Sequence, residues 1–318
     1  MRLLFITSTR IGDAVLSTGL LKHLLDRHPG ARVTIVVGSA AAPLFEAVPG
    51  LERTITIKKR PFKGHWLGLW RAVAFRRWDL VVDLRASAIA YLLPARRRLV
   101  VGPSDSERHR VEELAGLAGS DPPPAPTIWT APRHEEAARR LIPDGKPVLA
   151  IGPTANWPGK QWRAERFAEL ARMLTDRGGA LAGGRVAVVA APHERAQVQP
   201  VIDSIPEGRV IELIENADLP TVAACLRRCD LYVGNDSGLM HLAAAAGAPT
   251  LGLFGPSQER RYRPWGDHAA YVRTIEPYEE LETRRAPPGE IQETLMDGLS
   301  VPAAVEAAEA LLERLGRA

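Results

Sequence analysis

The chain has 318 residues, of which 46% are hydrophobic and 25% are charged. This composition is typical of a globular protein long enough for two domains, each with its own core. No apolar run reaches the length of a membrane-spanning helix. Polar residues from Thr7 onwards end the apolar start so soon that we expect a first strand there rather than a signal peptide. The only cysteines, Cys225 and Cys229, argue against a disulfide framework and a zinc site, so we expect a cytosolic protein.

The net charge of +4 hides an uneven distribution. Residues 1–145 carry 22 Lys and Arg against 14 Asp and Glu, whereas the remainder carry 19 against 23. Much of the positive excess lies between Lys58 and Arg110. Such a half would attract a phosphorylated substrate, an acidic lipid surface or another polyanion, although solvated surface charge is the simpler explanation for any single arginine. Without a helix-turn-helix signature or an aromatic-interleaved basic motif, no nucleic-acid partner is expected.

The first part of the chain alternates short apolar runs with helical patterns. We expect strands at Leu3–Thr7, Arg32–Val37, Arg53–Ile57, Leu80–Asp83 and Leu99–Val101. Between them we expect helices near Ala14–His28, Ala40–Ala47, Gly64–Arg76 and Ser87–Leu93. This alternation predicts a parallel sheet with helices on both faces.

A proline-rich stretch, Ser120–Pro126, cannot be helix or central strand, and the pattern restarts after a helix near His134–Leu141. The second set of strands is expected at Val148–Ile151, Arg185–Ala190, Arg209–Leu213, Leu231–Val233 and Thr250–Phe254. Its helices are expected near Ala164–Arg177, Glu194–Ile205, Leu219–Arg227, Gly238–Ala246 and Pro302–Leu315. The expected fold class is therefore α/β, with two doubly wound Rossmann-like domains facing across a cleft at the carboxyl ends of their strands.

The two patterns also predict the domain boundaries. We assign residues 1–145 to an N-terminal domain and residues 146–300 to a C-terminal domain, with a linker around residues 130–146. Residues 301–318 form a C-terminal helix, for which packing back towards the N-terminal domain is one option. The segment Asp267–Gly298 is acidic and rich in proline and fits no expected element.

The first candidate site follows the first strand, at Thr7–Leu16. It contains neither a dinucleotide-binding glycine pattern nor a Walker lysine, which excludes both of those nucleotide sites. What remains is a turn with Gly12 and one carboxylate, Asp13, at the start of a helix. Asp13 is either the N-cap of that helix or a general base, a role for which an ionised carboxylate is suited.

The second candidate site is the loop Gly152–Trp162, which follows the first strand of the C-terminal half. A loop of small residues with Thr154, and with Lys160 ahead of a helix, can hold phosphate through a hydroxyl, backbone amides and a point charge. The alternative is a solvent loop whose lysine points outwards. Two tryptophans flanking one lysine in a loop of glycine and proline favour the phosphate site.

Two further candidate sites lie at predicted strand ends. Glu194, in Ala190–Glu194, is either a partner for the helix dipole or an acceptor for sugar hydroxyls. In Tyr232–Leu242 an Asp-Ser-Gly turn leads into an alanine-rich helix, and such a helix start offers amides to an anion such as a pyrophosphate. An ordinary N-cap is the alternative for this turn. His241 in the first turn is either a core histidine or a phosphate donor.

No Asp-x-Asp pair follows a strand, and no group of His, Cys and carboxylates has metal-ligand spacing. We therefore expect neither a metal ion nor another cofactor. Backbone amides, Lys160 and the helix start would carry the charge of a pyrophosphate instead.

Taken together, these motifs resemble the ADP-heptose:lipopolysaccharide heptosyltransferases, glycosyltransferase family 9. The resemblance rests on Ile11-Gly12-Asp13 before a leucine-rich helix, on Asp79–Arg85, on the Gly152–Trp162 loop with Lys160, and on Asn235–Leu242 with Phe254-Gly255-Pro256. These matches follow one another in both halves, so the resemblance covers nearly the whole chain.

The resemblance implies a GT-B fold and transfer of heptose from ADP-heptose, with inversion and without a metal. Asp13 would be the catalytic base. The donor would be bound by the C-terminal domain through Thr154, Ala155, Lys160, Glu194, Asp236, Ser237, Gly238 and His241. Of these, Thr154 and Lys160 would contact the phosphates, and Glu194 the adenosine ribose. The acceptor would be bound by the basic N-terminal domain through Arg10, Lys58, Arg60 and Arg85.

The implied acceptor is a phosphorylated, Kdo-bearing lipid, so the resemblance places the protein in the cytoplasm, peripheral to the inner membrane and in transient contact with it. The chain departs from the family at Ala155, where many members have a hydroxyl, and at Asp-Ser-Gly in place of Asp-Thr-Gly. These differences leave the exact donor sugar and acceptor open. Three alternative functions are considered besides. They are another nucleotide sugar for O-antigen or capsule, a nucleotide-sugar 2-epimerase on the same scaffold, and a non-catalytic nucleotide-binding or lipid-docking protein.

Overall fold

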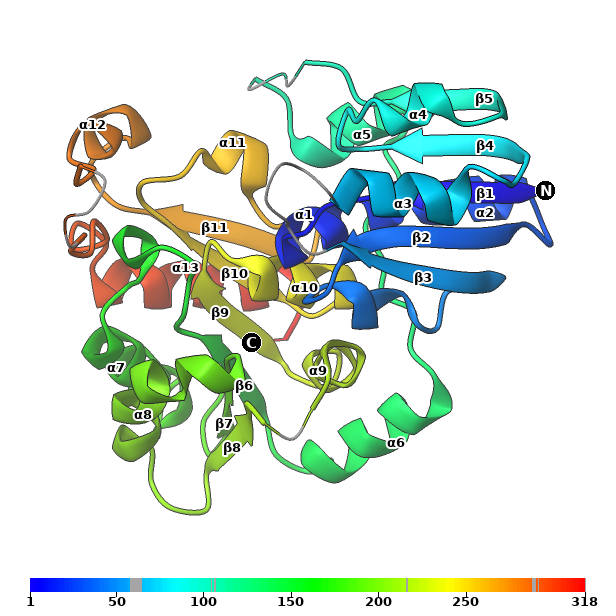
Figure 1. Cartoon of the computed structure of the whole chain (residues 1–318). Coiled ribbons are helices and arrows are strands. Elements are labelled where there is room, and N and C mark those ends of the chain that lie inside the picture. Colours follow the sequence, from blue (N-terminus) through cyan, green and yellow to red (C-terminus); the bar gives the residue numbers. More distant parts are fainter. Residues whose placement is uncertain are drawn as a thin grey trace. The chain divides into compact units, whose positions relative to one another are not determined.

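The computed structural model describes residues 1–57, 65–103, 105, 107–215, 217–287, 290 and 292–317. The chain divides into two compact units, Met1–Ala131 and Pro132–Ala318. Each unit is a parallel sheet covered by helices (Figure 1). The division falls earlier than the expected boundary after residue 145, because α6 (Pro132–Leu141) packs against α9 (Leu219–Leu226) of the second unit.

The sheet of the first unit has the strand order β3-β2-β1-β4-β5, with every pair parallel. Its strands are β1 (Arg2–Ile6), β2 (Arg32–Gly38), β3 (Leu51–Ile57), β4 (Trp78–Asp83) and β5 (Ala95–Val100). Central strands such as β1 and β2 are buried after their first residue, as expected for runs of Val, Ile and Leu covered on both faces. All five strands predicted for this half are confirmed.

The helices of the first unit are α1 (Ile11–Leu16), α2 (Thr18–Arg27), η1 (Ala42–Phe45), α3 (His65–Val73), α4 (Ile89–Leu92) and α5 (Arg110–Ala118). The single helix expected over 14–28 is instead two helices that meet at Ser17. The Ser17 hydroxyl donates to the Ala14 carbonyl at 2.7 Å and lies 2.8 Å from the Thr7 hydroxyl, which ties the break to the end of β1. Helix α5 was not predicted.

The sheet of the second unit has the order β11-β10-β9-β6-β7-β8 and is also parallel throughout. Its strands are β6 (Val148–Gly152), β7 (Arg185–Val189), β8 (Val210–Leu213), β9 (Leu231–Asn235), β10 (Thr250–Phe254) and β11 (Ala269–Arg273). The five predicted strands are confirmed. Strand β11 lies in the segment left unassigned by the sequence, and it is hard to recognise because it is an edge strand with no buried residue.

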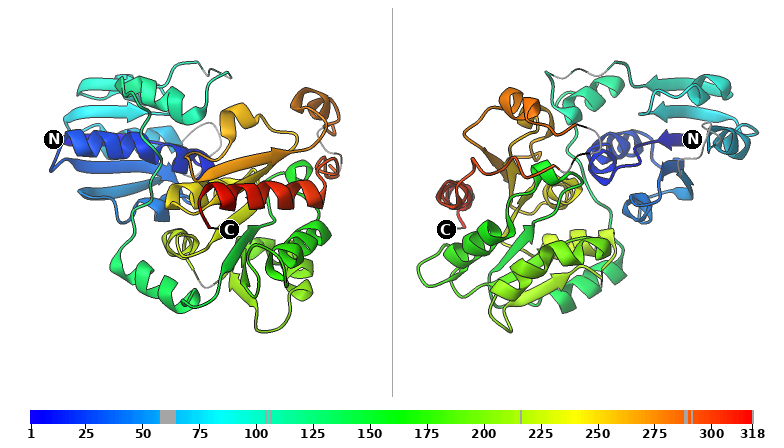
Figure 2. Two further views of the ribbon diagram at one scale, coloured as in Figure 1. Left: turned by 180° about the vertical axis from the view of Figure 1, so that it is seen from behind. Right: turned by 60° about the vertical axis from the view of Figure 1, so that its left-hand side comes forward.

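The remaining helices of the second unit are η3 (Pro158–Lys160), α7 (Ala164–Thr175), η4 (Pro192–Glu194), α8 (Arg195–Ser204), α10 (Gly238–Ala246), α11 (Glu259–Tyr262), α12 (Tyr278–Thr283) and α13 (Val301–Arg314). Helix α13 packs against α7 and β11, as the view from behind in Figure 2 shows. It buries Val305, Ala308 and Leu311 in the same hydrophobic cluster as the sheet. The C-terminal helix is therefore part of the core of the second unit.

The two cysteines are structural. Cys225 and Cys229 are free thiols, and both are buried. Burial raises the pKa of Cys225 to about 12, so this thiol stays protonated and unreactive at neutral pH. Among the helices of the described ranges, none is long and apolar enough to cross a membrane.

A buried tyrosine explains why the central strands β6 and β9 carry glycines near their carboxyl ends. Gly152 pairs with Gly234 across the two strands. The Tyr232 hydroxyl would lie 2.0 Å from a Cβ added to Gly152 and 2.4 Å from one added to Gly234. Neither position can therefore carry a side chain, and the tyrosine sets the shape of the sheet edge from which the loops of the second unit begin.

Gly152→Ala is expected to lower the free energy of unfolding by about 1–3 kcal/mol, because the new methyl group overlaps the Tyr232 hydroxyl. The loss should be smaller in a Tyr232→Phe background, where that oxygen is absent. Urea denaturation of the four proteins of this cycle measures both effects. Gly116→Ala in α5, where a Cβ would meet nothing within 4 Å, is the control and should not destabilise. Equal losses in both backgrounds would contradict the steric explanation.

Candidate active site

The second unit brings a lysine and an aspartate from two loops into contact. Lys160 ends the short helix η3 after β6, and Asp236 follows β9 directly. The two strands are neighbours in the sheet, so their carboxyl ends meet at one edge. Lys160 Nζ donates to Asp236 Oδ2 at 2.5 Å, with 23% of the lysine side chain and 7% of the aspartate side chain exposed. The contact joins two predicted site residues that are 76 positions apart.

Asn235, the last residue of β9, holds the Gly152–Trp162 loop, which carries Lys160, to the sheet. Asn235 was not among the predicted site residues. Its side chain is fully buried. Asn235 Nδ2 donates to the Pro153 carbonyl at 2.8 Å, and Oδ1 accepts from the Trp162 backbone amide at 3.1 Å. Both ends of the Lys160 loop are thus bound to one side chain. An asparagine at the end of a buried strand, where an apolar residue would be expected, is the signal that could have identified it.

Asn235→Ala is expected to lower the free energy of unfolding by about 2–4 kcal/mol, because it leaves a buried carbonyl and a buried amide without their partners. Urea denaturation monitored by tryptophan fluorescence measures this loss. Asn156→Ala is the matched control, since Asn156 is exposed in the same loop, and its effect should stay within about 0.5 kcal/mol. Similar losses in the two variants would contradict the bracing role of Asn235.

A second pair of predicted residues also meets at this edge of the sheet. The Thr154 hydroxyl donates to Glu194 Oε2 at 2.9 Å, and the same oxygen accepts from the Ala191 backbone amide at 2.8 Å. Glu194 therefore satisfies the start of η4, which was one of its two predicted roles. The neighbouring Ala155 is buried, and its carbonyl accepts from the side chain of Gln161 at 2.8 Å.

The start of α10 has no side-chain cap. Ser237 occupies the N-cap position, but its side chain accepts no hydrogen bond from the helix amides. The prediction of an ordinary N-cap therefore holds for the position and fails for the interaction. The Ser237 hydroxyl is buried and has no hydrogen-bond partner among the described residues. Gly238 is the first helical residue, and His241 lies buried on the same helix. The amides of the first turn of α10 are thus available to an anion.

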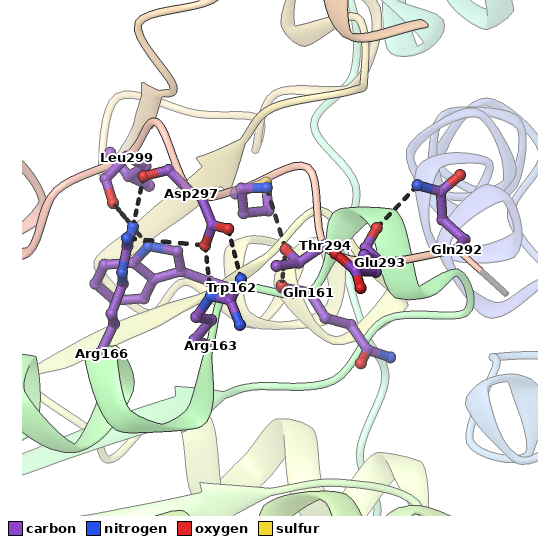
Figure 3. A network of polar contacts seen from close by, with 10 residues as sticks. Gln161, Trp162, Arg163, Arg166, Gln292, Glu293, Thr294, Asp297 and Leu299 are labelled. Atoms are coloured by element: carbon purple, nitrogen blue, oxygen red, sulfur yellow. Dashed lines mark hydrogen bonds and ion pairs between the residues drawn. The ribbon is translucent and has the colours of Figure 1, made fainter. Parts of the chain in front are cut away.

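A C-terminal segment, which we call the strap (residues 292–299), is hydrogen-bonded to the loop that carries Lys160, and Figure 3 shows the contact at Gln161. The Thr294 hydroxyl donates to the Gln161 carbonyl at 2.5 Å. The Leu295 amide donates to the Gly159 carbonyl at 3.0 Å. These bonds hold the backbone on both sides of Lys160. Apart from Leu299, the strap lies within Asp267–Gly298, the segment in which the sequence predicted no helix or strand.

The strap is anchored to the start of α7 by arginines and a tryptophan. Arg163 binds both carboxylate oxygens of Asp297, each at 2.6 Å. Arg166 donates to the backbone carbonyls of Asp297 and Leu299, and Trp162 Nε1 donates to the carbonyl of Leu299 at 2.9 Å. The hydrogen bond from Arg163 lowers the pKa of Asp297. Because both side chains of this ion pair are about half exposed, its contribution to stability is modest.

Asp297→Asn should destabilise the protein by no more than about 1 kcal/mol at neutral pH, because the pair is solvent-screened. The direction of the pH dependence follows from the lowered pKa of Asp297. The carboxylate stabilises the fold above its unfolded pKa of about 4, and this stabilisation is lost as the pH falls through the lower folded value. The difference in melting temperature between wild type and variant should therefore shrink from pH 7 to pH 3. Asp267→Asn, at an exposed carboxylate of the same unit, is the matched control and should leave the melting temperature at neutral pH close to that of the wild type.

The first unit presents Asp13 from the first turn of α1. Arg10, not Asp13, is the N-cap residue of this helix, so the N-cap prediction for Asp13 is wrong. Asp13 is half-buried, and its Oδ2 accepts a long hydrogen bond of 3.3 Å from the Ser8 hydroxyl. The Ser8 hydroxyl in turn accepts from the Arg10 backbone amide at 3.1 Å. The aspartate is thus held loosely by its own loop.

The turn after β4 presents Arg85. Asp83 is fully buried and accepts hydrogen bonds from the Arg85 amide, the Ser87 amide and the Ser87 hydroxyl. Between them Ala86 has a φ of 49°, a conformation that costs energy for a residue with a side chain. The Arg85 guanidinium lies 5.1 Å from the Trp66 ring centroid, and its Nη1 is buried without a hydrogen-bond partner among the described residues.

The structure says less about the surroundings of the other residues predicted to bind the acceptor. Arg10 is exposed at the start of α1. Lys58 and Arg60 lie outside the described residues. Of the residues predicted to bind the acceptor, Arg85 is therefore the one whose environment the structure defines best.

Residues 110–288, more than half of the chain, match the profile of glycosyltransferase family 9 (heptosyltransferase). The chain belongs to this family. It is therefore a glycosyltransferase, and the resemblance inferred from its motifs is confirmed. One relative is lipopolysaccharide heptosyltransferase 2 of Salmonella typhimurium, which is 25% identical over 321 residues that cover 88% of this chain and 90% of the relative.

Solved structures show the same fold. A family 9 glycosyltransferase from Veillonella parvula has a TM-score of 0.79 at 22% identity, with 98% of this chain and 97% of that chain covered. The E. coli ADP-heptose lipopolysaccharide heptosyltransferase II has a TM-score of 0.75 at 20% identity, with coverages of 99% and 100%. These likenesses confirm the GT-B class expected for two doubly wound parallel sheets.

Proposed function

We propose that this glycosyltransferase moves a heptose from ADP-heptose to a phosphorylated, Kdo-bearing lipopolysaccharide core acceptor, with inversion at the anomeric carbon. The observation that carries the proposal is the meeting of Lys160, Asp236 and the uncapped start of α10 at one sheet edge. The donor is suggested by solved structures of an E. coli heptosyltransferase of similar fold, one with ADP and one with ADP-2-deoxy-2-fluoro heptose.

We assign the diphosphate to Lys160 and to the backbone amides of Ser237 and Gly238 at the start of α10. A departing ADP gains negative charge as the glycosidic bond breaks, and a lysine beside a helix start stabilises that charge. Asp236 keeps Lys160 oriented before the donor binds and can then accept from a sugar hydroxyl. His241, one turn into the helix, completes the donor group. Because these groups supply the positive charge, transfer is proposed to need no metal ion.

The adenosine end of the donor is assigned to Glu194. Its Oε2 is occupied by the Thr154 hydroxyl and the Ala191 amide, which leaves Oε1 for a ribose hydroxyl. The only proton of the Thr154 hydroxyl points at this carboxylate. We therefore assign Thr154 a positioning role for Glu194, and leave phosphate contacts at this loop to the backbone amides of Thr154 and Ala155.

Asp13 is proposed as the general base that takes the proton from the acceptor hydroxyl while the sugar carbon loses ADP. Its long bond to Ser8 leaves the carboxylate able to accept a better donor. The acceptor phosphates are assigned to Arg10, Lys58, Arg60 and Arg85. Arg85 fits this role because one of its nitrogens has no partner among the described residues. A lipid acceptor would place the protein at the cytoplasmic face of the inner membrane.

A donor panel tests the function. Calorimetry with ADP, UDP, GDP and their sugars should show selective binding of ADP and ADP-heptose, and transfer to a Kdo-bearing lipid acceptor should need no added metal and survive EDTA. Preference for a UDP-sugar would favour O-antigen or capsule synthesis instead. Turnover of UDP-N-acetylhexosamine without acceptor would favour an epimerase.

Asp13→Asn should lower the rate of transfer by at least about 10²-fold while ADP affinity stays near that of the wild type, because only proton transfer is lost. Asp26→Asn is the matched control in the same unit, since Asp26 is exposed and pairs with Lys22. It should change neither quantity. Loss of ADP binding and transfer together in Asp13→Asn would mean that Asp13 is structural.

A further inference from the structure

Large apolar side chains are exposed together on two helices of the first unit. Leu67 is 53% exposed, Phe75 87%, Tyr91 68% and Leu92 63%. They lie on α3, just after α3, and on α4. We call these four residues the α3–α4 face. They are four of the seven large hydrophobic side chains that are exposed in the described part of the chain. A cluster of exposed apolar side chains of this kind is typical of an interaction surface.

Both helices cover the same face of the first sheet. Leu69 and Val73 of α3 and Ile89 and Ala90 of α4 belong to one hydrophobic cluster with the sheet. Figure 1 shows α3 and α4 in front of this sheet, and Figure 2 shows α2 on the opposite face. The α3–α4 face is therefore the outer surface of a single layer. A partner that contacts one of these helices can contact the other.

The exposure is not the result of frayed chain ends, because the sheet anchors both helix ends. Trp78 Nε1 from β4 donates to the Val73 carbonyl at the end of α3, at 3.0 Å. Arg98 from β5 donates to the Ala90 carbonyl at 2.7 Å and to the Leu93 carbonyl at 2.6 Å. These bonds satisfy the last carbonyls of each helix. They hold the apolar side chains outwards on a rigid support.

The segment that carries the α3–α4 face is also rich in arginine. Residues 65–100 contain seven arginines, no lysine and two aspartates. Of the aspartates, Asp83 is fully buried, and Asp79 pairs with Arg96. Arg71 and Arg77 are exposed and have no ion-pair partner within the described ranges. Leucine and aromatic side chains flanked by arginines match the requirements of the interface of an anionic bilayer, where rings lie at headgroup depth and arginines meet phosphates.

We propose that the α3–α4 face docks this unit on a membrane surface that contains anionic phospholipids. The inference deepens the proposed function, since a lipid-linked acceptor lies in such a surface. It rests, however, on the exposed side chains and arginines of this unit rather than on any donor contact. The occupant is a bilayer rather than a protein, because exposed arginines outnumber carboxylates in this segment and its one accessible carboxylate, Asp79, is paired with Arg96.

Sedimentation of the full-length protein with vesicles tests the proposal, without donor or acceptor present. Vesicles of phosphatidylcholine mixed with phosphatidylglycerol should bind the wild type, and vesicles of phosphatidylcholine alone should bind it at least about tenfold more weakly. Phe75→Ser/Leu92→Ser should lower binding to the anionic vesicles by about tenfold or more. Ile275→Ser is the matched control, because Ile275 is 91% exposed in the second unit, and it should bind like the wild type.

A charge-reversal pair tests the arginines. Arg71→Glu/Arg77→Glu should lower binding to anionic vesicles, and the effect should weaken at high salt. Arg172→Glu/Arg177→Glu makes the same change in net charge on exposed residues of the second unit and should have a smaller effect. Melting temperatures confirm that each variant is folded.

Equal binding by wild type and Phe75→Ser/Leu92→Ser, equal loss in Ile275→Ser, or no binding of the wild type to anionic vesicles would overturn the proposal. So would equal losses in the two charge-reversal pairs. Because no nucleotide sugar is present, failure of the donor assignment would leave these results unchanged. Conversely, failure to bind vesicles would leave transfer to a detergent-dispersed acceptor intact.

Discussion

The candidate donor site depends on the two hydrogen bonds by which the side-chain amide of Asn235 holds the loop that carries Lys160. Lys160 lies on a loop, and a loop lysine free to rotate would lose much of its value as a phosphate ligand because ordering it would cost entropy. Asn235 binds the loop at Pro153 and again at Trp162. Asp236, the next residue, then meets Lys160 itself. One strand end thus positions both the support of the lysine and its counter-charge.

The strap adds a second constraint on the same loop from the opposite end of the unit's sequence. Hydrogen bonds from Thr294 and Leu295 hold the backbone at Gln161 and Gly159. The arginines of α7 then hold the strap at Asp297 and Leu299. The lysine loop is therefore preorganised both by β9 and by the strap. Preorganisation of this kind allows electrostatic stabilisation of a leaving group without reorganisation at the moment of reaction.

The first unit is organised differently, and the difference fits the division of labour that we propose. Its candidate base, Asp13, has one long hydrogen bond within its own loop, whereas Glu194 and Asp236 of the second unit have short ones. A base must exchange partners during the reaction, while groups that bind the donor benefit from a fixed position. On the same unit, α3 and α4 expose apolar side chains on a rigid layer rich in arginine. Acceptor chemistry and membrane contact would then share one unit.

Much of the fold could be predicted because strands buried on both faces have a simple pattern. Ten of the eleven strands in the described ranges, and the bounds of α10, were identified from short runs of Val, Ile and Leu and from helical periodicity. The exceptions have local causes. Strand β11 is an edge strand with no buried residue, and the break at Ser17 comes from a hydroxyl that bonds to Ala14 and Thr7. Neither effect leaves a mark in hydrophobic periodicity.

The sequence by itself determined which residues stand at the strand ends, and therefore which chemistry the chain can offer: Asp13, Lys160, Glu194 and the turn before α10. Only the tertiary structure decided how those residues are supported. Pairing of β6 with β9 brings Lys160 to Asp236, and packing of the strap on α7 brings residues near 297 to residues near 163. Such contacts join positions far apart along the chain. Their choice depends on strand order and side-chain packing, which no short stretch of sequence contains.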